Sequence, residues 1–392
     1  MFPERFSNLP EYAFPRLRAL LDRHRPGGPA LAMSIGEPRH PHPAWVAGII
    51  AEHAAEFGNY PVNEGTPGLR RAVCAWMARR YGVTLDPDRE VMALNGSREG
   101  LYNAMMALCP EAKGGKWPLV LIPNPFYQVY MVGALSVGAE PIFVPATRGT
   151  GFLPDFSALS AETLNQTAVA WLCSPSNPQG AVATEDDWAH LIGLAELYDF
   201  KVFADECYSE IYRDTPPPGA LQVARQMGAD PERVVVFQSL SKRSNLPGLR
   251  SGFVAGGPES IRRMKQLRAY AGSPLPMPIQ HASERLWDDE EHVHENRRLY
   301  GEKYAIADEI LAGIDGYEPP EAGFFLWLPV PDGETAALKL WRETGVQVLP
   351  GAYLGREVAG ENPGRGYVRA AMVAPRDEVA DGLGRLRACL YG

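Results

Sequence analysis

The sequence predicts an α/β protein with a large domain, in which helices cover both faces of a mostly parallel sheet, and a smaller α+β domain. Seven short apolar segments alternate with longer helical patterns, at 90–94, 118–122, 141–144, 168–172, 201–203, 233–237 and 251–255. Strands that are apolar along their whole length and separated by helices are typical of a parallel sheet buried on both faces. The chain has 392 residues, more than one core usually holds, so we expect a second domain.

The smaller domain is expected from the last third of the chain. Residues 280–313 combine an apolar spacing with charged positions and predict one long helix. Residues 323–330 and 366–373 predict two further strands. The proline-rich segments 216–218 and 274–278 are interpreted as loops.

Composition excludes several classes of function. The net charge of −9 and the lack of a long basic run argue against a nucleic-acid partner. No apolar stretch approaches the roughly 20 residues that span a membrane, and the first residues lack a signal-peptide pattern. Five scattered cysteines without metal-like spacing favour free thiols in a reducing compartment, so we expect a cytoplasmic protein without a bound metal.

The segment 239–250 combines a lysine with groups that can bind a phosphate. Lys242 follows the hydroxyls of Ser239 and Ser241, and Arg250 stands eight residues further on, all directly after an apolar run. A lysine near a cation and several dipoles can be shifted toward its neutral, nucleophilic form. This strand end could therefore hold pyridoxal phosphate, which carries both a phosphate and an aldehyde. Taken alone, the segment could equally be an exposed loop.

Two preceding apolar runs also end in polar groups. Asn177 lies in the proline-containing turn after 168–172, and Asp205 ends the run that begins at 201, with Tyr208 three residues later. In open parallel sheets ligands bind beyond the carboxyl ends of the strands. We therefore expect these side chains to meet Lys242 in one site.

These motifs have the order and spacing of the class I/II aminotransferases, a family of fold-type I pyridoxal-phosphate enzymes, which the chain resembles from about 34 to 374. The resemblance implies that Lys242 forms a Schiff base with the cofactor and then transfers protons. It places Asp205 at the pyridine nitrogen, and Tyr208 and Asn177 at the ring oxygen. It also implies three parts: 1–43 as an N-terminal arm and part of the small domain, 44–280 as the large cofactor-binding domain, and 281–392 as the small C-terminal domain.

The resemblance also implies how the rest of the cofactor is held. The turn around Ser97 and Arg98 opens a helix near Glu99, and backbone N–H groups at a helix start form an anion site; a plain turn is the alternative. The phosphate is expected to contact the backbone N–H groups of this turn and the side chains of Ser239, Ser241 and Arg250. Tyr127 matches the aromatic residue that stacks on the cofactor ring, although an aromatic in such a loop could instead belong to the core.

Arg369 is the expected ligand of the substrate carboxylate, because a guanidinium inside an apolar strand would be costly to bury without an anionic partner. Gly36 matches the glycine whose backbone contacts the same carboxylate. Tyr60 matches the tyrosine that reaches the cofactor phosphate of a neighbouring subunit, which implies a homodimer with shared sites. Arg39, with His40, could meet a distal anion of the substrate, and an exposed loop is the alternative for both.

Three segments resemble bacterial succinyldiaminopimelate transaminases of lysine and diaminopimelate biosynthesis, namely 34–41, 291–300 and 348–357. This resemblance implies amino transfer between N-succinyl-LL-2,6-diaminopimelate and 2-oxoglutarate. The alternatives are an aminotransferase for aspartate, glutamate or aromatic donors, or a C–S lyase, racemase or decarboxylase on the same fold. Segment 271–280 lacks a basic residue, which argues against aspartate as the main donor. A ligand-sensing regulator is disfavoured because only some forty residues, too few for a DNA-binding domain, precede the first family motif.

Overall fold

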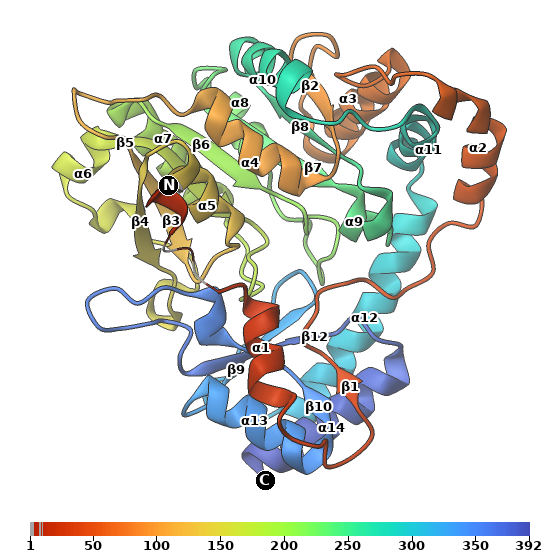
Figure 1. Ribbon diagram of the computed structural model, residues 1–392, viewed down its shortest axis with the longest axis vertical. Coiled ribbons are helices and arrows are strands. Elements are labelled where there is room, and N and C mark those ends of the chain that lie inside the picture. The colour runs from red at the N-terminus through yellow and green to blue at the C-terminus, as the bar shows by residue number, and fades with distance from the viewer. Residues whose placement is uncertain (1–3, 8, 10) are drawn as a thin grey trace.

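The computed structural model describes residues 4–7, 9 and 11–392, and Figure 1 shows a large sheet with its helices above a smaller group of strands and helices. The strands are β1 (Leu31–Ala32), β2 (Val91–Leu94), β3 (Leu119–Asn124), β4 (Glu140–Pro145), β5 (Thr167–Cys173), β6 (Lys201–Asp205), β7 (Val234–Ser239), β8 (Gly252–Gly256), β9 (Phe325–Pro329), β10 (Val346–Gln347), β11 (Leu349–Pro350) and β12 (Tyr367–Ala371).

The helices are α1 (Ala13–Leu21), α2 (Val46–Glu52), α3 (Pro67–Tyr81), α4 (Ser97–Leu108), α5 (Val129–Ser136), α6 (Ala161–Gln166), α7 (Glu185–Tyr198), α8 (Ala220–Met227), α9 (Leu240–Arg243), α10 (Pro258–Ala271), α11 (Met277–Asp288), α12 (Glu291–Leu311), α13 (Gly333–Thr344) and α14 (Arg376–Tyr391).

The large sheet has seven strands in the order β2-β8-β7-β6-β5-β3-β4. Only β8 runs against its neighbours, since it pairs antiparallel with both β2 and β7 while the other pairs are parallel. All seven strands fall where the apolar segments predict them. The prediction of a mostly parallel sheet is therefore confirmed.

Helices cover both faces of this sheet because its strands are apolar on both sides. In β7, Val234 and Val236 face a core built with α3, α7, α8 and α11. Val235 and Phe237 face a second core built with α4, α5 and α10. The alternation follows from the two-residue period of a strand, and the double cover agrees with the sequence-based expectation.

The smaller region contains two short sheets. One has the antiparallel order β11-β12-β9, and the other pairs β1 in parallel with β10. Helices α12, α13 and α14 share a core with these strands, and the C-terminus lies at their far side (Figure 1). Because β1 pairs with β10, a segment near residue 31 lies with the C-terminal part of the chain. The predicted division of the chain into three parts, with boundaries after residues 43 and 280, stays a prediction.

The prediction of one long helix over 280–313 is wrong, because the chain forms α11 and α12 with a break between them. Asp289 is extended and ends α11. The buried Arg243 donates to the carbonyl oxygens of Leu286 and Asp289, at 2.5 and 3.1 Å. These contacts replace the helical partners that the two carbonyls lack. Among the described residues, no helix combines the length and the apolar character needed to cross a membrane.

Candidate active site

A cavity of about 400 Å³ opens beside the carboxyl ends of β5, β6 and β7. Its size lies within the range of small-molecule sites. Twelve of the predicted site residues line it, namely Gly36, Ser97, Arg98, Tyr127, Asn177, Asp205, Tyr208, Ser239, Ser241, Lys242, Arg250 and Arg369. Residues more than 300 positions apart therefore contribute to one chamber.

The register of the parallel strands explains why these residues meet. Asp205, the last residue of β6, lies beside Cys173 at the end of β5 and beside Phe237 near the end of β7. Helix α9 then begins directly after Ser239, whose Oγ accepts a hydrogen bond from Ser241 N at 3.1 Å. This cap turns the chain at the sheet edge and brings Lys242 over the cavity.

Lys242 is partly buried, and its Nζ donates to the carbonyl oxygen of Gly36 at 2.5 Å. Burial lowers its pKa to about 8, and the positive charges of Arg369 and Arg250 act in the same direction. The lowered pKa increases the share of this lysine that is unprotonated near neutral pH and can act as a nucleophile or base.

Asp205 is a buried carboxylate without a cationic partner. Tyr130 Oη donates to its Oδ2 at 2.6 Å, and Cys207 N donates to its Oδ1 at 3.3 Å. Among the described residues, no Lys, Arg or His lies within ion-pair distance of it, and burial raises the pKa of its carboxyl group. A cation entering the cavity would offset this cost of burial.

The turn between β2 and α4 lies against Arg250. Gly96 has φ of +79°, and a Cβ there would lie 2.0 Å from Arg250 Nη2, so only glycine fits. Ser97 is the first residue of α4, where backbone N–H groups point outward from the helix. Arg250 itself is left-handed, with φ of +55°. This end of the cavity therefore combines N–H groups, hydroxyls and a guanidinium.

Two aromatic side chains, Tyr127 and Tyr208, form parts of the cavity wall. Tyr127 accepts a hydrogen bond from Arg98 Nε at 2.6 Å and meets Tyr130 edge-on at 5.8 Å between ring centroids. Tyr208 packs edge-on against Phe324 and Phe325, at 5.4 and 5.8 Å. Packing thus restrains both rings beside the cavity.

Arg369 lies buried in β12, at 4% exposure. Its Nη1 donates to Asn177 Oδ1 at 3.0 Å and its Nη2 donates to the carbonyl oxygen of Ser34 at 2.8 Å. Its guanidinium stands over the Phe325 ring at 4.1 Å. Burial lowers its pKa to about 10. No carboxylate among the described residues pairs with it, so its charge is available to an anion in the cavity.

Two predicted site residues lie outside the cavity. Arg39 Nη1 pairs with Glu378 Oε2 at 3.0 Å on the surface, so the structure does not support its predicted contact with substrate. The neighbouring His40 is held by Asn296 Oδ1 at 2.8 Å and packs on Tyr300. Tyr60 is fully exposed and contacts no part of this chain's cavity. Its predicted role in a neighbouring subunit stays a prediction.

Sequence reasoning missed several residues of the cavity wall. Tyr130 is the most consequential, because it donates to Asp205; its place three residues after Tyr127 was the only sequence signal. Tyr12 and Phe14 reach the cavity from the start of α1, and Glu37 stands at the wall beside Gly36. No motif marks these three positions. The bonds Ser174–Pro175 and Asn177–Pro178, which the sequence left open, are cis.

The residues present fit pyridoxal phosphate. The unpaired Asp205 suits a protonated pyridine nitrogen, and the cradle formed by Gly96, Ser97 and Arg250 suits a phosphate. Lys242, with its lowered pKa, lies on the same cavity wall and can meet an aldehyde. The pyridine nitrogen, the phosphate and the aldehyde of the cofactor are thus each matched by a different part of the cavity wall.

Comparison with known proteins agrees with this fit. Residues 29–385 match the family described as aminotransferase class I and II. The chain is 34% identical to the LL-diaminopimelate aminotransferase of Desulforudis audaxviator, over 99% of this chain and 97% of that one. It is similar to an aminotransferase structure from Neisseria meningitidis (38% identity, TM-score 0.94, all of both chains). A probable N-succinyldiaminopimelate aminotransferase from Thermus thermophilus is 27% identical, with TM-score 0.86 over 96% of this chain and all of that one. The chain therefore belongs to the class I and II aminotransferases and is a pyridoxal-phosphate-dependent aminotransferase.

Proposed function

We propose that the enzyme moves an amino group between a diaminopimelate-type amino acid and 2-oxoglutarate. The observation that carries the proposal is that Lys242, with a pKa of about 8, and the buried Arg369 face one cavity. An amine that can transfer a proton and a guanidinium that can hold a carboxylate are the two groups that an amino acid substrate requires. A cytoplasmic location is part of the proposal.

When bound, pyridoxal phosphate supplies an aldehyde that takes up the amino group and a ring that withdraws electrons from the reacting carbon. Lys242 Nζ removes the proton from the substrate Cα and returns a proton to the product. Asp205 would keep a proton on the pyridine nitrogen, and Tyr130 and the Cys207 N–H orient that carboxylate. Tyr208 and Asn177 would donate to the ring oxygen, and Asn177 Oδ1 also accepts a hydrogen bond from Arg369.

Two forms of the donor have separate support. The sequence segments 34–41, 291–300 and 348–357 favour N-succinyl-LL-2,6-diaminopimelate, which is our first candidate. The relative from Desulforudis audaxviator favours free LL-diaminopimelate. Glu37 also favours the free form, because its carboxylate lies at the cavity wall and could pair with a distal ammonium group.

The proposal includes a homodimer in which Tyr60 completes the partner's site. Tyr60 is fully exposed, and its neighbours Phe57 and Val62 are 56% and 39% exposed. Apolar side chains gathered at the surface are typical of an interaction site. A symmetric dimer would bury this segment on both subunits.

The donor is identified by a single-turnover assay. The cofactor-loaded enzyme is mixed with N-succinyl-LL-diaminopimelate, LL-diaminopimelate, glutamate, aspartate or phenylalanine, and formation of the pyridoxamine form is followed by absorbance. We expect one of the two diaminopimelates to react with the highest second-order rate constant, at least about tenfold above that of aspartate or phenylalanine. A faster reaction with aspartate or phenylalanine would contradict the substrate assignment, whereas no pyridoxamine form with any donor would contradict amino transfer itself.

Lys242 is predicted to be the residue that binds the cofactor aldehyde. Borohydride reduction of the loaded enzyme, followed by peptide mass mapping, should place the pyridoxyl group on Lys242. Lys303 is an internal control, since burial also lowers its pKa to about 8 but its Nζ donates to Met372 O outside the cavity. Label on Lys303, or on any other lysine, would refute the assignment.

Arg369→Lys should lower kcat/KM for every donor and for 2-oxoglutarate alike, by about 10- to 150-fold, because a hydrogen bond to a charged group contributes about 1.5–3 kcal/mol. Lysine keeps the charge but loses the planar fork. Arg39→Ala is the matched control and should leave all these values within about twofold, because Arg39 pairs with Glu378 outside the cavity. A loss confined to one substrate would show that Arg369 does not hold a shared carboxylate.

The shared site is tested by mixing two inactive variants, Lys242→Ala and Tyr60→Ala, under conditions of subunit exchange. A mixed dimer keeps one intact site only if Tyr60 acts across the interface. Random pairing should then restore about one quarter of the wild-type activity. Proven exchange without recovery would place Tyr60 outside the partner's site.

A further inference from the structure

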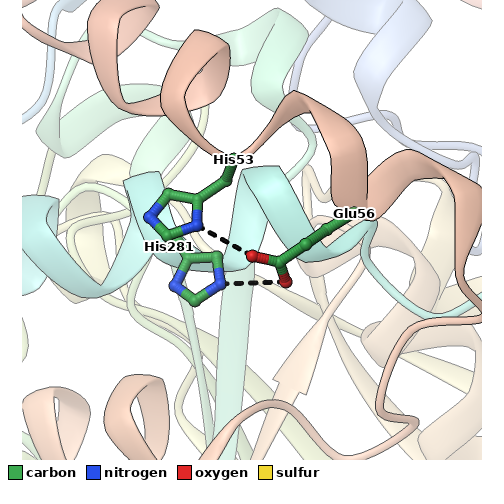
Figure 2. A group of neighbouring side chains, drawn as sticks. All are labelled: His53, Glu56 and His281. Atoms are coloured by element: carbon green, nitrogen blue, oxygen red, sulfur yellow. Dashed lines mark hydrogen bonds and ion pairs between the residues drawn. The ribbon is translucent and has the colours of Figure 1, made fainter.

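Two histidines and a glutamate gather at the surface, outside the cavity (Figure 2). His53 directly precedes the 3-10 helix Ala54–Gly58, which follows α2, and Glu56 lies within it; His281 lies on α11. His53 Nδ1 lies 2.8 Å from Glu56 Oε1, and His281 Nε2 lies 3.2 Å from Glu56 Oε2. The two imidazole rings stack at 3.8 Å, with 15° between their planes.

We propose that His53, Glu56 and His281 bind a divalent transition-metal ion, with Zn²⁺ preferred. Two imidazole nitrogens and one carboxylate oxygen form a donor set that Zn²⁺ uses in proteins. Imidazole disfavours Mg²⁺ and Ca²⁺, which prefer oxygen ligands. This site does not depend on the amino-transfer chemistry, and none of its residues lines the active-site cavity.

The ligand atoms already lie close together, and binding requires the two stacked rings to tilt toward one ion. A tetrahedral Zn²⁺ with bonds of about 2.0–2.1 Å holds its ligand atoms about 3.4 Å apart. Here the two nitrogen–oxygen separations are 2.8 and 3.2 Å, and all the ligand atoms lie within 4.8 Å of one another. Since the side chains are 27–32% exposed, they can adjust, and water can take a fourth position.

The charge of the cluster also favours a cation. Both carboxylate oxygens of Glu56 accept hydrogen bonds from imidazole nitrogens, so His53 Nδ1 and His281 Nε2 carry the hydrogens in these contacts. A metal ion can replace these two hydrogens once the stacked rings turn so that both nitrogens point at the same ion. The ion would then cross-link α11 to residues 53–56, which lie 225 positions away from it in the sequence and lead into Tyr60.

The test measures Zn²⁺ binding to the pyridoxal-phosphate-loaded enzyme after chelation and dialysis. Equilibrium dialysis with metal analysis should find one Zn²⁺ per chain at this site, and Zn²⁺ should raise the Tm, because a ligand of the folded state stabilises it. Glu56→Gln and His281→Gln should each weaken binding at least about tenfold, since even residues behind the metal ligands contribute that much. Substitution by Co²⁺ should give the visible absorption of a four-coordinate ion.

His294→Ala is the matched control, because His294 is exposed on α12 and belongs to no such cluster among the described residues. It should leave Zn²⁺ affinity and stoichiometry unchanged. Circular dichroism and amino-transfer activity show whether each variant has folded. Equal Zn²⁺ affinity in the wild type and both cluster variants would overturn the site, as would failure of the wild type to bind Zn²⁺. If Ca²⁺ bound as tightly as Zn²⁺, the assignment of the site to a transition-metal ion would be refuted.

Discussion

The parallel pairing of β5, β6 and β7 is the constraint on which the rest of the site depends. It places the ends of three strands at one edge and leaves their last side chains and the following turns facing one cavity. Asp205 is buried there because its strand is apolar on both faces up to that residue. A buried carboxylate without a cationic partner is costly, and a cation bound in the cavity would offset this cost.

Arg369 joins three parts of the chain that line the cavity. It lies in the small antiparallel sheet, and it donates to Asn177 beyond the large sheet and to Ser34 after β1. Lys242 adds a second link between the large sheet and the N-terminal segment, through Gly36 O. Movement of either sheet relative to the other would therefore change the position of the guanidinium relative to the reacting amine. The same contacts hold the active-site groups in place before substrate binds.

Much of this arrangement could be predicted from the sequence. The seven strands of the large sheet are visible as apolar runs because a strand covered on both faces has no polar alternation. Lys242, Asp205, Asn177 and Arg369 were recognisable because each is a polar residue inside an apolar strand, at its end, or in the segment directly after it. Tyr130 was missed because its role depends on where α5 crosses the sheet. Arg39 was considered for the substrate because it closely follows Gly36, and its surface pairing with Glu378 could not be foreseen because Glu378 is 339 positions away in the sequence.

The sequence by itself determined the order of the strands along the chain, the double cover of the large sheet and the polar residues that end its strands, because these follow from local hydrophobicity and spacing. Only the tertiary structure decided which distant side chains meet. The break between α11 and α12 depends on Arg243, and the cluster at Glu56 depends on His281 reaching it from α11. Such contacts join positions tens to hundreds of residues apart, and their geometry is set by how whole helices pack on the sheet, which no local pattern in the sequence records.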